Sequence, residues 1–315
     1  MNFTTTGRRR LFTIEDLGIT WAESYTQAPN ALVMGDVVRV YFSTRQRDGH
    51  FWTSRIAFAD LDPNKDFRVI GVSKNPVLDL GGLGAFDMFG VYPASVIRDA
   101  GGFLMAYGGW SRPTDVPFDV AVGLARSSDG IKFHRLGQGP ILGKTAKEPY
   151  VLSSPKIRKI AGKYFLFYIS GVKWINGSQK PEPIYKIRMA MSVDGASWVR
   201  MERDLIEDKI PFESQASPDV FYYGGEYHMI FSFRGPSDYL LGPNSYRMGY
   251  ARSEDLMVWK RQDDLFPFPL GGQGWDSEMV AYPNVFFVNS RPYLLYTGNG
   301  VGRTGIGIAA LEIEK

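Results

Sequence analysis

The stretch AYPNVFFVNSRPYLLYTGNG, from Ala281 to Gly300, contains the pattern that decides the fold. A proline opens a short apolar segment, a tight turn follows, and an aromatic-rich segment ends in Thr-Gly. Two short apolar segments separated by turn residues are typical of a β-hairpin. The stretch therefore predicts two antiparallel strands.

The same pattern occurs five times along the chain. The four earlier copies are QAPNALVMGDVVRVYFS from Gln27, VYPASVIRDAGGFLMAYGG from Val91, SSPKIRKIAGKYFLFYISG from Ser153 and ASPDVFYYGGEYHMIFSFRG from Ala216. The anchoring prolines are 62 to 65 residues apart, at Pro29, Pro93, Pro155, Pro218 and Pro283. A fixed period of this length indicates a fold built from repeated structural units.

A second motif follows three of these hairpins. It reads ARSSDGIKFHRL from Ala125, AMSVDGASWVRM from Ala190 and ARSEDLMVWKRQ from Ala251, with a degenerate copy, IAFADLDPNKDFRVI, in the first unit. Each copy predicts a strand, a Ser-x-Asp turn and a further strand that opens on an aromatic residue. Four antiparallel strands per unit make up a β-propeller blade. We therefore predict an all-β, five-bladed β-propeller that occupies residues 1–315 as a single domain.

The last unit ends soon after its third strand, at ALEIEK. A propeller leaves only short, protected sheet edges when its first and last units meet. We expect an N-terminal strand near Arg10–Ile14 to supply the missing fourth strand and to close the ring.

Composition excludes several classes of protein. The 315 residues include no cysteine, which rules out disulfides and cysteine nucleophiles, and only three histidines, which disfavours a His-based metal site or catalytic triad. The charges nearly balance at +3, and the basic run Arg8–Arg10 is too short to indicate nucleic-acid binding, so we expect a solvated terminal segment there. No apolar run approaches a signal or membrane-spanning segment, and we expect a soluble cytoplasmic protein without nucleic-acid or membrane partners.

Strand order decides which loops lie on one face of such a fold. The turns within each predicted hairpin are short, whereas the loops between second and third strands are long, as in GWSRPTDVPFD and RGPSDYLLGPNSYR. Together with the connections between units, these long loops meet at one end of the central channel. Long loops on a rigid scaffold are where ligands usually bind, and we expect the functional site there.

Acidic residues occur a few positions before each anchoring proline. They are Glu23, Asp87, Glu148, Glu213, Asp276 and Glu278. Each one alone is well explained as a residue that solvates a loop or bonds a turn. Carboxylates that converge on one channel mouth repel one another, so a set of them indicates function.

Cationic and aromatic residues alternate with these acids in the long loops: Arg45, Arg47, Trp110, Arg112, Lys173, Trp174, Tyr185, Arg234, Tyr239, Tyr246 and Arg303. Aromatic faces stack on sugar rings, acids bond hydroxyls, and cations balance negative charge, so this mixture favours a carbohydrate ligand. Packing between blades is the alternative for each aromatic residue. The expected substrate-binding residues are Glu23, Gln27, Arg45, Tyr92, Trp110, Glu148, Tyr185, Arg234, Tyr246, Asp276, Tyr282 and Arg303.

The five-fold strand pattern with its S-x-D-G-x-x-[FW] turns resembles the five-bladed propeller glycoside hydrolases of families 43, 32, 68, 117 and 130. It is more similar to a group of bacterial propeller proteins described as glycosylases, often found with surface-polysaccharide or secondary-metabolite genes. The segments FSTRQRDGH, GAFDMFGVYP, AYGGWSRPTDVPFD, PIYKIRMAMSVDG, YRMGYARSEDL and GWDSEMVAYP carry the resemblance over nearly the whole chain.

The sequence departs from family 43 at the three catalytic carboxylates. Ala28, Ala94 and Ser153 stand where that family has its base, its second aspartate and its general acid. The family's residue roles therefore do not carry over, and any acids for catalysis must come from the connections between units.

The resemblance implies a glycoside hydrolase-like enzyme that acts on a small-molecule or oligosaccharide substrate. We expect Asp87, Glu213 and Glu278 to be the catalytic residues of a mechanism that inverts the anomeric centre, with one carboxyl protonated and one ionised. Arginines in the loops favour an acidic or phosphorylated sugar. A glycoside phosphorylase or transferase and a non-catalytic carbohydrate-binding propeller stay open as alternatives. No cofactor or metal ligand cluster is expected, although the resemblance leaves a divalent cation in the channel open.

Overall fold

The computed structural model describes residues 2–240 and 242–314. Strands make up nearly all of the regular structure, which confirms the all-β class. The described helical segments are single turns: α1 (Ile14–Leu17), α2 (Asn299–Gly302), η1 (Pro63–Lys65) and η2 (Asp263–Leu265).

Three of the sheets in the described chain have four antiparallel strands each. The first contains β10 (Leu152–Ile160), β11 (Lys163–Asn176), β12 (Pro181–Ser192) and β13 (Val199–Arg200). The second contains β14 (Ser214–Tyr223), β15 (Glu226–Arg234), β16 (Arg247–Ser253) and β17 (Lys260–Arg261). The third contains β18 (Ala281–Val288), β19 (Arg291–Thr297), β20 (Ile306–Glu314) and β1 (Asn2–Phe12).

The fourth sheet consists of two groups of four strands. The first group is β2 (Ser24–Met34), β3 (Val37–Asp48), β4 (Phe51–Asp62) and β5 (Arg68–Val72). The second is β6 (Gly90–Asp99), β7 (Gly102–Ser111), β8 (Asp119–Ser127) and β9 (His134–Arg135). A single parallel pairing, Ser54 with Gly90, links β4 to β6. The strands therefore follow the repeat units read from the sequence.

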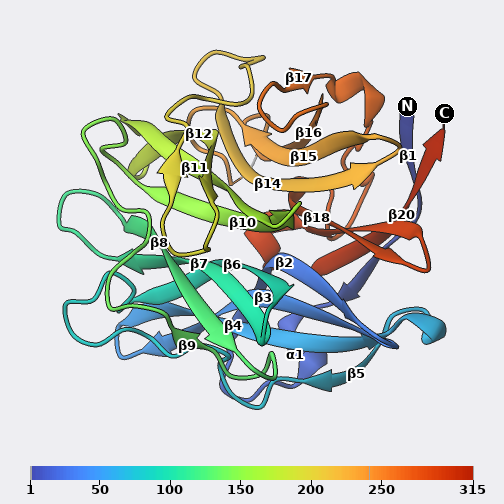
Figure 1. Ribbon diagram of the computed structural model, residues 1–315, viewed down its shortest axis with the longest axis horizontal. Helices are drawn as coiled ribbons and strands as arrows, with labels where there is room; N and C mark the ends of the chain where they lie inside the picture. Colours follow the sequence, from blue (N-terminus) through green and yellow to red (C-terminus); the bar gives the residue numbers. More distant parts are fainter. Residues whose placement is uncertain (1, 241, 315) are drawn as a thin grey trace.

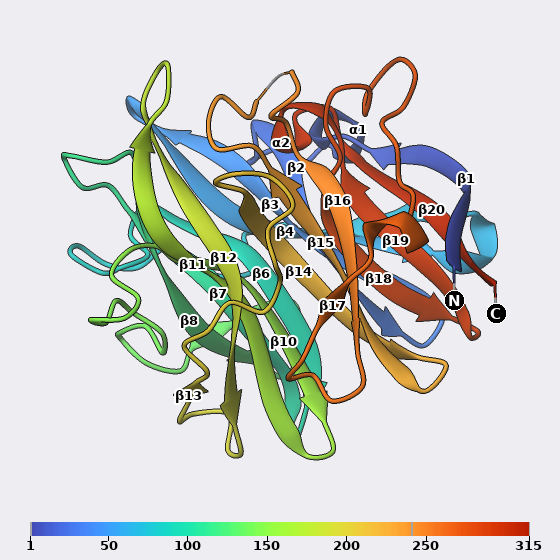
Figure 2. The ribbon, with the colours of Figure 1, turned by 90° about the horizontal axis from the view of Figure 1, so that it is seen from above.

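The N-terminal strand begins earlier than the sequence suggested. β1 pairs with β20 from Asn2, opposite Glu314, to Phe12, opposite Ile306. The prediction that this strand extends to Ile14 is wrong, because β1 ends at Phe12 and Thr13 caps α1. Its hydroxyl accepts a bond from the Asp16 amide, and the Asp16 carboxylate accepts one from the Thr13 amide, which starts a helical turn at Ile14. The strands at the two ends of the described chain, β1 and β20, lie side by side (Figures 1 and 2).

The Ser-x-Asp turns have one geometry in three units. In the turn at Ser192, the serine hydroxyl accepts a bond from the Gly195 amide at 2.9 Å, and the Asp194 carboxylate accepts bonds from the next two amides, each at 2.8 Å. These amide bonds lower the pKa of Asp194. Equivalent bonds form at Ser127 and at Ser253. The motif is therefore a turn and no part of the ligand site.

Hydrophobic cores lie between neighbouring four-strand groups. Each of five clusters contains residues of two adjacent groups, and examples of the residues they join are Phe42 and Leu295, Phe58 and Met105, Leu124 and Leu166, Phe167 and Phe231, and Tyr250 and Tyr296. Each group buries both of its faces, because it packs against one neighbour on each side. The last group packs against the first as the others pack against their successors.

The first strand of each group lies around the middle of the molecule, as Figure 1 shows for β2, β6, β10, β14 and β18. Side chains that follow the prolines link these strands in sequence. The links are Asn30 Oδ1 to Val96 N (2.5 Å), Ser95 Oγ to Ile157 N (3.2 Å), Lys156 Nζ to Asp219 Oδ1 (3.0 Å), Asp219 Oδ2 to Val285 N (2.6 Å) and Asn284 Oδ1 to Ala31 N (2.6 Å). All five anchoring prolines line one narrow cavity between these strands. The repeat thus brings equivalent residues to a common axis.

Candidate functional site

A cavity of about 340 Å³ opens at one end of this axis. Its aromatic lining consists of Trp52, Tyr92, Trp110, Phe118, Tyr185, Tyr239, Tyr246 and Tyr282. Its polar lining consists of Gln27, Arg45, Ser54, Arg112, Ser153, Ser154 and Lys180. Among the described residues, no aspartate or glutamate lines it. The cavity is therefore lined by aromatic and cationic side chains, whereas the sequence had suggested a ring of carboxylates.

Residues directly before the prolines form the floor of the cavity. Gln27, Tyr92, Ser154 and Tyr282 each lie one or two positions before a proline. Ser154 and Tyr282 have φ angles of 49° and 55°, in the left-handed region that residues other than glycine seldom adopt. The register of each first strand also shifts here. Such bulges turn side chains away from the alternation of a regular strand, and strained backbone is concentrated at functional sites.

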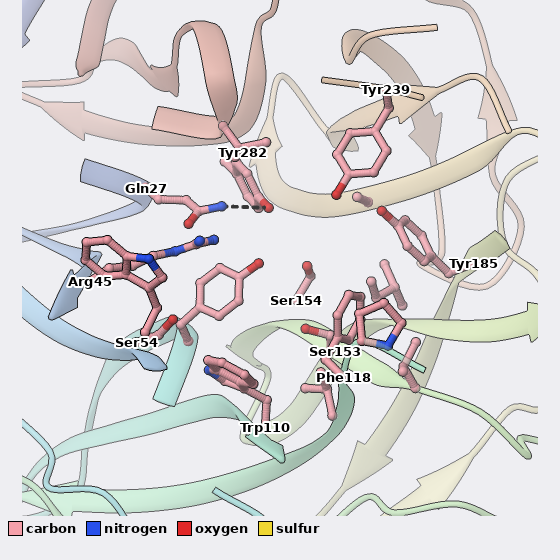
Figure 3. Close-up of a pocket in the computed structure, with 18 of the residues that line it drawn as sticks. Gln27, Arg45, Ser54, Trp110, Phe118, Ser153, Ser154, Tyr185, Tyr239 and Tyr282 are labelled. Carbon is pink, nitrogen blue, oxygen red and sulfur yellow. Dashed lines mark hydrogen bonds between the residues drawn. The ribbon is translucent and has the colours of Figure 1, made fainter. Parts of the chain in front are cut away.

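The remaining walls come from the second, third and connecting segments of several groups. Arg45 lies on β3, Trp52 and Ser54 on β4, Trp110 on β7 and Tyr185 on β12. Figure 3 shows Gln27 and Arg45 on one side of the opening, Tyr185 and Tyr239 on the other, and Trp110 and Phe118 along a third. Residues of the predicted long loops and of the connections between units therefore line one cavity, as expected.

Two arginines enter the cavity without a counter-charge. The Arg112 guanidinium lies over the rings of Phe51, Phe89 and Trp110, with centroid distances of 4.6, 4.8 and 5.0 Å, and Arg45 lies 4.2 Å above Tyr25. Within the described chain neither guanidinium is within 4.0 Å of a carboxylate, and Arg45 Nε is buried without a hydrogen-bond partner. Burial lowers the pKa of Arg112. Cations held in this way favour an anionic ligand.

Tyrosine hydroxyls form a second cluster in the cavity. Tyr185 and Tyr246 bond each other through their hydroxyls, and Arg234 Nε donates to both, at 3.2 and 3.3 Å. On the other side, Gln27 Nε2 donates to the Tyr282 hydroxyl at 3.2 Å. Burial raises the pKa values of Tyr92, Tyr239, Tyr246 and Tyr282. These hydroxyls therefore keep their protons at neutral pH and are able to donate hydrogen bonds.

The structure places four of the six predicted acids outside the cavity, in buried ion pairs. Asp87 bonds Arg135 at 2.7 Å and the Tyr107 hydroxyl at 3.0 Å. Glu213 bonds Arg261 at 2.6 Å, and both side chains are 0% exposed. The prediction that these two acids lie at the channel mouth is wrong, because they precede the prolines by five or six residues and reach the fourth strand of their own group.

The same contact recurs for Glu148 and Asp276. Glu148 bonds Arg200 and, at 3.3 Å, Arg188. Asp276 bonds Arg8 of β1 at 2.6 Å. The placement of both acids as substrate ligands is contradicted by this geometry, and so is the expectation that Arg8 belongs to a solvated segment. These acids tie each connection to the last strand of its group.

Four other predicted residues also lie outside the cavity lining. Glu278 is exposed; its backbone amide donates to Asn299 Oδ1, and its carbonyl accepts a bond from the Ser245 hydroxyl. Glu23 is exposed and accepts a bond from the Arg47 amide at 2.7 Å. Arg303 is exposed and lies 5.8 Å from the Tyr25 ring centroid. Arg234 is fully buried behind the lining tyrosines.

Seven predicted binding residues do line the cavity: Gln27, Arg45, Tyr92, Trp110, Tyr185, Tyr246 and Tyr282. Sequence reasoning missed Trp52, Ser54, Phe118, Ser154 and Lys180 as members of the site. Ser153, which the resemblance sets at the position of the family 43 general acid, lines the cavity as well, while Ala28 and Ala94 line the narrow proline-lined cavity. The positions of the family's carboxylates are therefore at the axis, but they hold no carboxylate here.

No group of three or more potential metal-ligating side chains occurs in residues 2–240 and 242–314. A search of the same residues for a helix long and apolar enough to cross a membrane also finds none.

Several solved structures with this fold are named as glycoside hydrolases or belong to studies of them. One belongs to a study of family 130 mannoside phosphorylases and of glycoside hydrolases that target β-1,2 mannosidic linkages in Candida mannan; its TM-score is 0.72 at 17% identity, over 98% of this chain and 94% of that chain. A thermostable family 43 glycoside hydrolase gives 0.65 at 16% identity, over 96% and 94%. The family 32 β-fructofuranosidase of Bombyx mori gives 0.63 at 16%, over 97% and 62%. The fold is that of the propeller glycoside hydrolases.

The chain belongs to the same family as the uncharacterised protein Rv1502 of Mycobacterium tuberculosis. The two are 31% identical over 296 residues, which are 93% of this chain and 95% of that protein. The chain is also 27% identical over 168 residues to a β-1,2-mannobiose phosphorylase of Thermoanaerobacter, over 50% of this chain and 54% of that enzyme. No protein-family model matches the chain.

Proposed function

We propose that the chain forms a single five-bladed propeller domain in which β1 closes the ring by completing the last blade. The five clusters between neighbouring groups, including the one between the last group and the first, support this reading. The convergence of the five prolines on one narrow cavity supports it as well. A closed ring would hold the cavity residues of all five units in fixed relation to one another.

We propose further that the protein is an enzyme that cleaves a glycosidic bond by phosphorolysis, with the sugar on the aromatic surfaces and phosphate on Arg45 and Arg112. The observation that carries the proposal is a carbohydrate-sized cavity with two arginines that have no counter-charge and, among the described residues, no lining carboxylate. Phosphate is itself the nucleophile in phosphorolysis, so the second carboxyl of a hydrolase is not needed. Similarity to a phosphorylase over half of the chain adds to this support.

Hydrolysis of an acidic or phosphorylated sugar is the second candidate. The same two arginines would then bind the charged group of the sugar. Inverting hydrolysis requires two carboxyls roughly 6.5–9.5 Å apart on either side of the bond. Of the three predicted catalytic acids, Asp87 and Glu213 are held in ion pairs with arginines. Among the described residues, no cation pairs with the exposed carboxylate of Glu278. A binding protein without catalysis is the third candidate, and it is favoured by the lack of a carboxylate among the described residues of the lining.

The experiment incubates the protein with nitrophenyl glycosides of neutral and acidic sugars, with and without inorganic phosphate. Phosphorolysis predicts that nitrophenol release depends on phosphate and that a glycosyl phosphate forms in equal amount. Arg45→Gln and Arg112→Gln should each weaken phosphate binding at least tenfold by calorimetry, whereas Arg47→Gln, an exposed arginine outside the lining, should not. Turnover of acidic glycosides that is independent of phosphate would establish hydrolysis instead. Binding without turnover would leave a binding protein.

A further inference from the structure

Two tyrosines and a buried arginine form a connected unit in the cavity wall. The Tyr185 and Tyr246 hydroxyls touch each other, and Arg234 Nε lies within bonding distance of both. Tyr185 and Tyr246 are 8% and 3% exposed, and both line the cavity. Packing alone does not require these two hydroxyl groups, because phenylalanine rings would fill the same space.

The remaining bonds of Arg234 fix its orientation. Its Nη1 donates to the Gly235 and Pro236 carbonyls, at 2.8 and 2.9 Å, and its Nη2 donates to the Pro183 carbonyl at 2.9 Å. The only carboxylate near it in the described chain is that of Glu182, with an N–O separation of 3.8 Å. The guanidinium thus bonds neutral oxygens, and its charge acts on the two phenol oxygens among them.

We propose that the Tyr185–Tyr246 pair, held by Arg234, is the proton donor to the leaving oxygen of the glycoside. The inference rests on the proposed phosphorolysis and assigns the group that reaction still lacks. Cleavage of a glycosidic bond to an ordinary alcohol requires an acid, and the lining offers hydroxyls where propeller hydrolases offer carboxyls.

The reaction balances with these groups alone. An oxygen of hydrogen phosphate attacks the anomeric carbon, and the bond from that carbon to the leaving oxygen breaks. The leaving oxygen takes the phenolic proton from the pair and departs as an alcohol. The proton of hydrogen phosphate then returns to the phenolate, so the pair is restored and a glycosyl phosphate remains. Arg234 stabilises the transient phenolate without touching the substrate, which makes it a positioning residue.

Glu182 is the alternative acid. It is 6% exposed, its Oε2 has no hydrogen-bond partner in the described chain, and burial raises its pKa. It does not line the cavity, however, and Arg234 lies between it and the tyrosine pair in the bonding network. We therefore assign the acid to the tyrosines and include Glu182 in the test.

The experiment compares two leaving groups in the presence of inorganic phosphate. Dinitrophenolate leaves without a proton, whereas methanol leaves only with one, so loss of the acid affects methyl glycosides alone. We expect Tyr185→Phe and Tyr246→Phe to lower kcat/KM for methyl glycosides about 10²–10⁴-fold, and to change dinitrophenyl turnover less than about tenfold. Arg234→Lys should have a kcat/KM for methyl glycosides between those of the tyrosine variants and wild type, and it should shift the pH profile of that turnover. Tyr227→Phe, which removes a phenol remote from the cavity lining, is the matched control.

Several results would overturn the assignment. If both tyrosine variants keep wild-type turnover of methyl glycosides, or if only Glu182→Gln loses it, the tyrosine pair is not the acid, although phosphorolysis itself stands. If the tyrosine variants lose both substrates and phosphate binding together, their role is structural. If wild type turns over neither substrate in phosphate, the proposed function fails, and the assignment fails with it.

Discussion

Replacing Glu213 by glutamine separates a structural role from a catalytic one. The sequence made this residue a candidate catalytic acid, but its carboxylate lies 2.6 Å from Arg261 Nη1, with both side chains 0% exposed. Gln215 Nε2 and the Lys209 amide also donate to it, at 3.1 and 3.2 Å. The substitution keeps the shape of the side chain and removes its charge, so that Arg261 loses its buried partner.

The magnitude follows from burial. Removing one partner of a buried ion pair costs about 3–5 kcal/mol, because the other charge is left without compensation. Arg261 keeps a second carboxylate, that of Asp263, at 3.0 Å, so we expect the lower end, about 3 kcal/mol. An unfolding entropy of about 2.1 cal/mol/K per residue gives a single domain of 315 residues a shift of about 1.5 °C in melting temperature per kcal/mol, which predicts a fall of about 4–5 °C.

Thermal and urea unfolding measure this change, and calorimetry with inorganic phosphate shows whether the cavity stays intact. Glu278→Gln is the control, since that carboxylate is exposed and should change stability by no more than about 0.5 kcal/mol. A double variant that also replaces Arg261 by methionine should recover part of the loss. A Glu213→Gln protein as stable as wild type but unable to turn over substrate would refute this reasoning and restore the catalytic assignment.

Further outcomes can be measured on the same protein. Burial opposes ionisation of Asp99, but hydrogen bonds from Lys159 and other donors lower its pKa from 3.8 to about 2. The ionised carboxylate therefore stabilises the fold fully above about pH 4, and this stabilisation is lost as the pH falls through about 2. Asp99→Asn should remove this part of the acid dependence of urea unfolding. Asn284→Ala leaves the Ala31 amide without its acceptor at the axis and should cost about 1–3 kcal/mol in thermal unfolding. Trp110→Ala should weaken binding of a neutral nitrophenyl glycoside about tenfold by calorimetry, with the same melting temperature within about 2 °C.

Most of the fold could be predicted from the sequence, because the repeat is visible there. The spacing of the five prolines and the Ser-x-Asp turns locates the strands in order, since each turn is a local structure built by its own side chains and amides. The position of the N-terminal strand was less accurate. Its pairing with β20 joins opposite ends of the chain, and the capping box at Thr13 was the only local sign of where the strand stops.

The site was only partly predictable, because sequence order does not show how far a side chain lies from the axis. Residues within two positions of a proline, such as Tyr92 and Tyr282, do line the cavity. Acids five to seven positions earlier, such as Glu213 and Asp276, do not. One sequence feature was overlooked: an arginine ends the last strand in FHR, WVR and WKR, at Arg135, Arg200 and Arg261. A basic residue that recurs in the same unit as an acid indicates an ion pair, and this pattern would have identified the partners.

The distribution of charge follows from this arrangement. In four groups the acid before the first strand is neutralised by an arginine of the fourth strand, which leaves those carboxylates unable to face a ligand without losing a buried partner. The first group differs: β5 carries Val72 opposite Ala59, at the place where β9, β13 and β17 carry an arginine opposite an alanine. Its acid, Glu23, accepts a bond from the backbone amide of Arg47. The six predicted acids are thus held in buried ion pairs or exposed, while within the described chain no carboxylate lies within 4.0 Å of the Arg45 or Arg112 guanidinium in the cavity. We expect a site built in this way to select an anion through the lack of competing carboxylates in its described lining as much as through its arginines.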